Sequence, residues 1–97
     1  MTRPKRIRRI NNPPPFKVFE PIGLQEGSNP ITINYEEYEA IRLSDFEFCK
    51  QIEAAQRMEV SRTTFARTYE SARRKVAEAF LQGKPIVFTT SQGDKQH

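Results

Sequence analysis

Apolar residues recur at helical spacing between residues 50 and 82, in two runs separated by a short break. In the first run Ile52, Ala55 and Met58 stand three residues apart, which places them along one face of a helix. The second run has intervals of four, three, four and four residues, the spacing of one buried helical face. Its members are Phe65, Tyr69, Ala72, Val76 and Phe80. The pattern predicts two amphipathic helices.

The break between the two predicted helices has the composition of a tight turn. The first helix is expected to stop at Glu59-Val60, and Ser61 can cap the second helix by accepting a hydrogen bond from a free amide of its first turn. The second helix is expected to run to about Gln82, because Gly83 suits a C-terminal cap. A short helix, a turn of three to four residues and a longer helix predict a helix-turn-helix.

The face of the second helix opposite its apolar stripe is basic and hydroxylic. From Arg62 to Lys75 the sequence has five cations and one acid, Glu70, an imbalance that favours a polyanionic partner. Arginine can donate two hydrogen bonds to guanine, and threonine can contact a thymine methyl group. We therefore predict that this helix binds double-stranded DNA in the major groove. Base edges are expected to be contacted by Arg62, Thr63 and Arg67.

Supporting contacts are predicted around these three residues. Hydroxyl groups would assist the base contacts or bind phosphate, and basic side chains would bind phosphate. The residues concerned are Ser61, Thr64, Ser71, Arg74, Lys75 and Lys50. An alternative stays open, because any hairpin of two helices has an apolar stripe and a charged back and can serve packing alone.

Charge is distributed in blocks along the 97 residues, whose net charge is +4. Residues 1–15 carry five cations and no acid, residues 16–49 have a net charge of −5, and residues 50–84 have a net charge of +4. The first block ends in three prolines, so we predict a disordered basic arm that lies along phosphates or in the minor groove. A solubilising tail is the alternative. The cations of the arm are Arg3, Lys5, Arg6, Arg8 and Arg9.

The rest of the chain predicts a third helix and two short strands. Asn34 is expected to cap that helix, with Glu37 in the capping-box position. The acids near its start are explained by the helix dipole. Residues 16–19 and 86–90 are rich in strand formers and are expected to pair, either within one chain or between two. Residues 24–30 predict a polar linker, and residues 91–97 a disordered tail.

Several function classes are disfavoured by composition. Cys49 and His97 are the only cysteine and histidine, so neither a disulfide framework nor a Cys/His metal site can form within one subunit. There is no nucleophile-base pair and no phosphate-binding glycine loop, so we expect no enzyme activity and no cofactor. There is no run of membrane-spanning length and no signal-peptide core, so a cytoplasmic protein without membrane contact is expected.

The runs YEAIRLSDFE and QIEAAQRMEVSRTTFARTYESARRKVAEAFLQGKPIVF resemble a family of small, uncharacterised prokaryotic proteins predicted to bind DNA. The helix-turn-helix of that family resembles region 4 of sigma-70 factors. The resemblance implies a mainly α fold, a three-helix helix-turn-helix domain over residues 16–90 with short N- and C-terminal β-strands. The pattern favours glycine where Phe48 and Glu59 stand, so Glu59 is expected in a left-handed conformation. Cys49 replaces a leucine and is expected to be a small buried apolar residue, and Lys50 replaces a capping Ser or Thr.

The combined expectation is a sequence-specific DNA-binding transcriptional regulator that acts as a homodimer. A sigma-like adaptor that contacts RNA polymerase through the acidic segment 36–47 is the first alternative. RNA binding through the arm is the second, although the chain has few aromatic residues arranged to stack on single-stranded bases.

Overall fold

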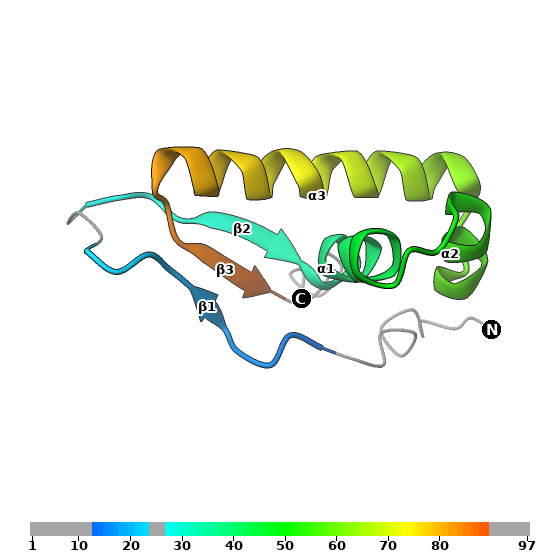
Figure 1. The fold of residues 1–97 in the computed structure, drawn as a ribbon, viewed down its shortest axis with the longest axis horizontal. Helices are drawn as coiled ribbons and strands as arrows, with labels where there is room; N and C mark the ends of the chain where they lie inside the picture. Colours follow the sequence, from blue (N-terminus) through cyan, green and yellow to red (C-terminus); the bar gives the residue numbers. More distant parts are fainter. Residues whose placement is uncertain (1–12, 24–26, 90–97) are drawn as a thin grey trace, which may run out of the picture.

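The computed structural model describes residues 13–23 and 27–89. The longest helix, α3 (Arg62–Gln82), runs along one whole side of the molecule. It lies over the sheet at one end and over the shorter helices at the other (Figure 1). The elements in chain order are β1 (Val18–Phe19), β2 (Ile31–Asn34), α1 (Tyr35–Ile41), η2 (Arg42–Phe46), α2 (Gln51–Met58), α3 (Arg62–Gln82) and β3 (Ile86–Thr89). The described part is therefore a small domain of three helices, with one π-helical turn, and a three-stranded sheet.

The sheet has the strand order β1-β3-β2. β1 runs antiparallel to β3, with Val18 opposite Val87, so the two predicted strands pair within one chain. β2 runs parallel to β3, with Ile33 opposite Phe88. β2 was not among the predicted strands. Its four residues, Ile-Thr-Ile-Asn, do alternate between apolar and polar, but so short a run is ambiguous and it ends directly at the helix cap.

The predicted capping box at the start of α1 is confirmed. The Asn34 side chain accepts a hydrogen bond from the Glu37 amide at 2.8 Å, and the Glu37 carboxylate accepts one from the Asn34 amide at 3.0 Å. The helix then widens into the π-helical turn η2, in which the Glu47 amide donates to the Arg42 carbonyl at 2.9 Å. The chain leaves this turn at Phe48, which has a positive φ of 58°. Two special backbone conformations thus set the direction in which α2 begins.

The turn between α2 and α3 also follows the prediction. Glu59 is left-handed, with φ 58° and ψ 44°, and the Ser61 hydroxyl accepts a hydrogen bond from the Thr64 amide at 3.0 Å. Lys50 begins α2 without a side-chain cap. α3 ends at Gly83, whose φ is 66°. These conformations fix how α2 and α3 cross.

Replacing Glu59 with glycine should stabilise the domain. A left-handed conformation costs a non-glycine residue roughly 1 kcal/mol, so we expect Glu59→Gly to raise the melting temperature by about 4–8 °C. The control is Glu53→Gly, the same substitution inside α2, which should destabilise by about 1 kcal/mol. Thermal unfolding of both variants measures the effect, and destabilisation by both would contradict a left-handed Glu59.

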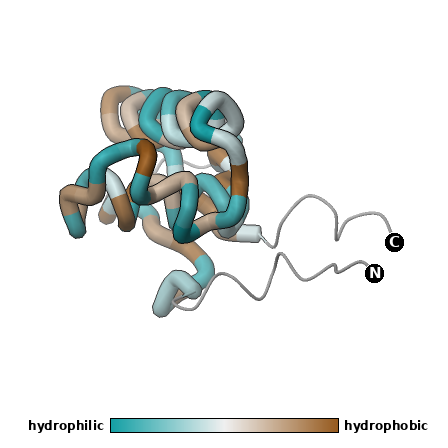
Figure 2. Tube along the Cα trace, turned by 90° about the vertical axis from the view of Figure 1, so that its right-hand side faces the viewer, coloured by the Kyte–Doolittle hydropathy of each residue, from teal (hydrophilic) through white to brown (hydrophobic). Residues whose placement is uncertain are grey.

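Buried residues form two clusters under α3. One joins α1, η2, α2 and the start of α3, and the other joins the sheet to the end of α3. The first contains Ala40, Leu43, Ala54, Ala55, Met58 and Phe65, with Cys49 packed against it. The second contains Ile33, Ala79 and Ile86. Figure 2, in which α3 is seen nearly end-on, shows hydrophobic positions, coloured brown, on several of the elements that lie below this helix. Cys49 itself is only half-buried.

The predicted apolar stripes are partly wrong. Ile52 is 55% exposed and Phe80 is 81% exposed. The buried positions of α3 are instead Phe65, Ala72 and Ala79, each two turns from the next. The small side chains of Ala72 and Ala79 let α3 lie close to α1 and to the sheet. Val76 and Phe80, one helical turn apart, then lie at the edge of this contact. Phe46, the last residue of η2, is also exposed.

Within the ranges 13–23 and 27–89, no helix is both long and apolar enough to cross a bilayer.

Candidate nucleic-acid interface

The first two turns of α3 present most of the predicted reading residues to solvent. Phe65 is completely buried and fixes the rotation of the helix about its axis. Thr63 and Arg67 stand two residues before and after it, so they point about 160° away from the core. Both are exposed, as are Arg62 and Thr64. The structure therefore brings Arg62, Thr63, Thr64 and Arg67 together on one accessible end of the helix, beside the turn from α2.

The cations of this surface differ in what they contact. Arg62, Arg67 and Arg74 have no ion-pair partner among the residues that the structure describes. Arg73 is different, because its guanidinium lies 5.4 Å from the centre of the Tyr69 ring and 3.6 Å from the Asp45 carboxylate. The three unpaired arginines leave positive charge available to a polyanion.

Two of the predicted DNA contacts, Ser71 and Lys75, face α1. The Ser71 hydroxyl donates a hydrogen bond of 2.7 Å to Glu37, and the Lys75 ammonium group lies 3.0 Å from both oxygens of the same carboxylate. Glu37 is only 5% exposed. Ser71 and Lys75 therefore do not point freely outward as expected, because both are bonded to Glu37, although they line the same groove as Arg67 and Arg74. Their place is set by the buried acid, which needs hydrogen-bond and charge partners.

Arg74 lies between two shallow grooves along α3. One groove, of about 420 Å³, extends from Arg67 to Glu78. The other, of about 540 Å³, reaches from Ala77 to Gln51 at the start of α2, next to the exposed Lys50. Arg74 thus lines both grooves, two turns along α3 from Arg67, and Lys50 directly precedes Gln51, which lines the second groove.

Acidic residues of α1 and η2 form internal contacts that the helix-dipole explanation did not foresee. The Arg42 guanidinium donates hydrogen bonds to Glu39 and Glu47, and these carboxylates raise its pKa. The Tyr69 hydroxyl donates to Asp45 at 2.6 Å, and this bond raises the pKa of Tyr69. The Arg42 contacts join α1 to the end of η2, and the Asp45 contact holds η2 against α3. The sequence signal for them was the surplus of acids in residues 36–47 beside a basic helix.

The predicted arm residues Arg3, Lys5, Arg6, Arg8 and Arg9 lie outside the described residues, as does the predicted tail at 91–97.

Comparison with known proteins places the chain in a family. The family described as "Protein of unknown function DUF134" matches residues 1–96. The chain belongs to the DUF134 family. The expected membership of a family of small prokaryotic proteins of unknown function is thereby confirmed.

Relatives of this DUF134 member occur in bacteria and archaea. It is 49% identical to a UPF0251 protein of Caldicellulosiruptor saccharolyticus over 89% of its own length and 60% of the relative's. It is 44% identical to a UPF0251 protein of Methanothermobacter thermautotrophicus, over 90% of its own length and 46% of the relative's. The chain therefore spans about half to three fifths of these relatives. No solved structure matches it.

Proposed function

We propose that this DUF134 protein binds double-stranded DNA sequence-specifically and regulates transcription, with α2 and α3 acting as a helix-turn-helix similar to that of sigma-70 region 4. The observation that supports this most is the exposed start of α3. There Arg62, Thr63 and Arg67 project from a helix that the buried Phe65 holds in one orientation. A helix of this kind fits the major groove, which is wide enough to admit it.

Each side chain has a role that its place supports. Arg62 and Arg67, which have no ion-pair partner in the part of the chain that the structure describes, can each donate a pair of hydrogen bonds to guanine, and Thr63 can contact a thymine methyl group or a base edge. Thr64, whose hydroxyl accepts a hydrogen bond from Ser61 at 3.0 Å, is placed at the helix start for a phosphate. Arg74 and Lys50 extend the contact along the phosphate backbone of the DNA, where they add affinity but no sequence preference.

The adaptor alternative has less support. It would use the acidic segment 36–47 as an interface with RNA polymerase. Four acids of this segment already accept hydrogen bonds from other side chains of the protein: Glu37, Glu39, Asp45 and Glu47. A segment whose charges are occupied internally offers little to a basic partner surface.

Replacing Arg67 with alanine should weaken binding to the preferred site by about 5–150-fold and relax its base preference at one position. The preferred site is first selected from random duplex DNA, and affinities are then measured by fluorescence anisotropy at two salt concentrations. Lys17→Ala is the matched control. It removes one positive charge from an exposed residue beside β1, on the sheet and away from the start of α3.

Two results would speak against the proposed function. If no site is enriched and binding disappears steeply with salt, only phosphate attraction is left. If Arg67→Ala and Lys17→Ala reduce the affinity equally, the start of α3 does not read the bases.

A further inference from the structure

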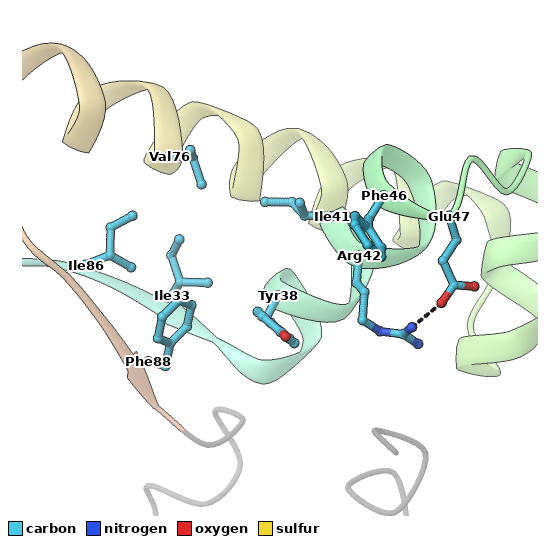
Figure 3. A pocket seen from close by; sticks show the side chains of 9 residues that line it. All are labelled: Ile33, Tyr38, Ile41, Arg42, Phe46, Glu47, Val76, Ile86 and Phe88. Carbon is cyan, nitrogen blue, oxygen red and sulfur yellow. Dashed lines mark hydrogen bonds and ion pairs between the residues drawn. The ribbon is translucent and has the colours of Figure 1, made fainter. Parts of the chain in front are cut away.

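An apolar groove opens between α3 on one side and α1 and the sheet on the other. Its volume is about 670 Å³. Figure 3 shows Val76 of α3 facing Ile33 and Ile86 of the sheet across this groove, with Ile41 and Phe46 at its other end. Apart from Arg42 and Glu47 at one end, and the hydroxyl of Tyr38, its lining is hydrocarbon. The proposed DNA-reading residues have no part in it.

A second hollow extends the same apolar surface toward the end of α3. It has a volume of about 360 Å³ and shares Val76 and Ile86 with the groove. Phe80, which is 81% exposed, and Phe19, which is 61% exposed, also line it. At the far end of the groove Phe46 is 77% exposed. We call this continuous strip from Phe46 through Val76 to Phe80 the apolar strip. Contiguous exposed apolar surface of this kind marks an interaction site.

The charges at the two ends of the apolar strip are largely paired within the chain. Arg42 is bonded to Glu47 at one end, and Lys84 lies 3.0 Å from Glu78 at the other, where Glu20 adds an acid. A second copy of this chain carries the same net charge of +4. Two such copies repel each other unless they meet through a surface with little net charge. The apolar strip is such a surface, whereas the start of α3 is not.

The strip also lies at a suitable distance from the start of α3. The reading segment 62–67 is centred about 17 Å from Val76 along the helix, from the α-helical rise of about 1.5 Å per residue. If two copies meet with antiparallel α3 helices and a two-fold axis near Val76, their reading segments lie about 34 Å apart. One turn of duplex DNA separates half-sites by about 34–36 Å.

We propose that the apolar strip is the contact surface for a second copy of this chain, in a two-fold dimer with the α3 helices antiparallel near Val76. The distance argument rests on the proposed DNA-binding function, whereas the arguments from the apolar lining and the paired charges do not. The two reading segments would then be related by the two-fold axis, and the preferred DNA site would be palindromic.

Sedimentation equilibrium of the full chain tests the dimer. Phe80→Glu and Phe46→Glu place a charge at either end of the strip, and each occurs twice in a symmetric contact. Each should therefore raise the dissociation constant of the dimer at least about a hundredfold. Both side chains are exposed, so the circular dichroism spectrum and the stability of the monomer should be nearly unchanged. The matched control is Phe48→Glu. Phe48 is 82% exposed but does not line the strip, and this variant should remain dimeric like the wild type.

Three results would overturn the dimer. The first is a wild-type chain that stays monomeric throughout the micromolar range. If that monomer binds an apolar dye and the strip substitutions abolish the binding, the groove is a site for a small ligand. Dimers that survive both strip substitutions would place the contact elsewhere. Loss of the dimer by Phe48→Glu as strongly as by Phe80→Glu would remove the special role of the strip.

DNA selection with the same proteins separates this inference from the proposed function. If the strip substitutions abolish the dimer but the protein selects no DNA site, the dimer contact is supported and the DNA-binding function is contradicted. If the protein is a monomer that selects a site without two-fold symmetry, the function is supported and the dimer contact is contradicted.

Discussion

Replacing Phe65 with alanine should lower the free energy of unfolding by about 3–5 kcal/mol. Phe65 is completely buried, and its ring stacks on that of Tyr69 at a centroid distance of 5.8 Å. Alanine would leave a cavity where α1, η2, α2 and α3 meet, because the surrounding helices can collapse only in part. Small domains have a total stability of roughly 5–15 kcal/mol, so the variant should be close to unfolded. Urea denaturation followed by circular dichroism measures the loss.

The control for this substitution is Phe80→Ala. It removes the same ring from the same helix, but at a position that is 81% exposed, so it should change the stability of the monomer by less than about 0.5 kcal/mol. Similar losses at both positions would mean that α3 is rotated relative to the core. That result would also contradict the orientation given for Arg62, Thr63 and Arg67, because the buried Phe65 determines which way these side chains point.

The features that could be predicted from the sequence depend on residues close to one another in the chain. The capping box joins Asn34 to Glu37, and the Ser61 hydroxyl caps the amide of Thr64, in each case across three residues. The left-handed Glu59 is determined by the geometry of a single turn. Signals of this length are complete within a short segment, so the predicted caps of α1 and α3 and the turn before α3 were confirmed.

The features that were missed depend on contacts across the fold. β2 is a strand because it pairs with β3, more than fifty residues later. Helical periodicity placed Val76 and Phe80 on a buried face, but within residues 13–23 and 27–89 no further layer covers that face after the sheet and α1 have packed on Ala72 and Ala79. The partners of Glu37 lie 34 and 38 residues away, so its role could not be distinguished from a helix-dipole effect.

Replacing Glu37 with alanine should have the second-largest effect on stability. The substitution removes the acceptor of the Asn34 amide and of the Ser71 hydroxyl, and it leaves Lys75 without its ion pair. The Lys75 side chain is 38% exposed and can turn to water, so the expected loss is about 2–4 kcal/mol, below that for a fully buried pair. The control is Glu53→Ala in the first turn of α2, an exposed acid that should cost less than about 0.5 kcal/mol.

The same carboxylate should also control how much positive charge α3 offers to DNA. In Glu37→Gln the side chain can still accept hydrogen bonds from Asn34 and Ser71, but Lys75 loses its counter-charge. Released toward solvent, Lys75 should strengthen binding to duplex DNA of unrelated sequence and steepen its salt dependence by about one unit. Lys75→Ala in the Glu37→Gln background should cancel the gain, whereas Lys75→Ala alone should change DNA affinity little. A large loss of affinity in that single variant would show that Lys75 contacts DNA despite its contact with Glu37.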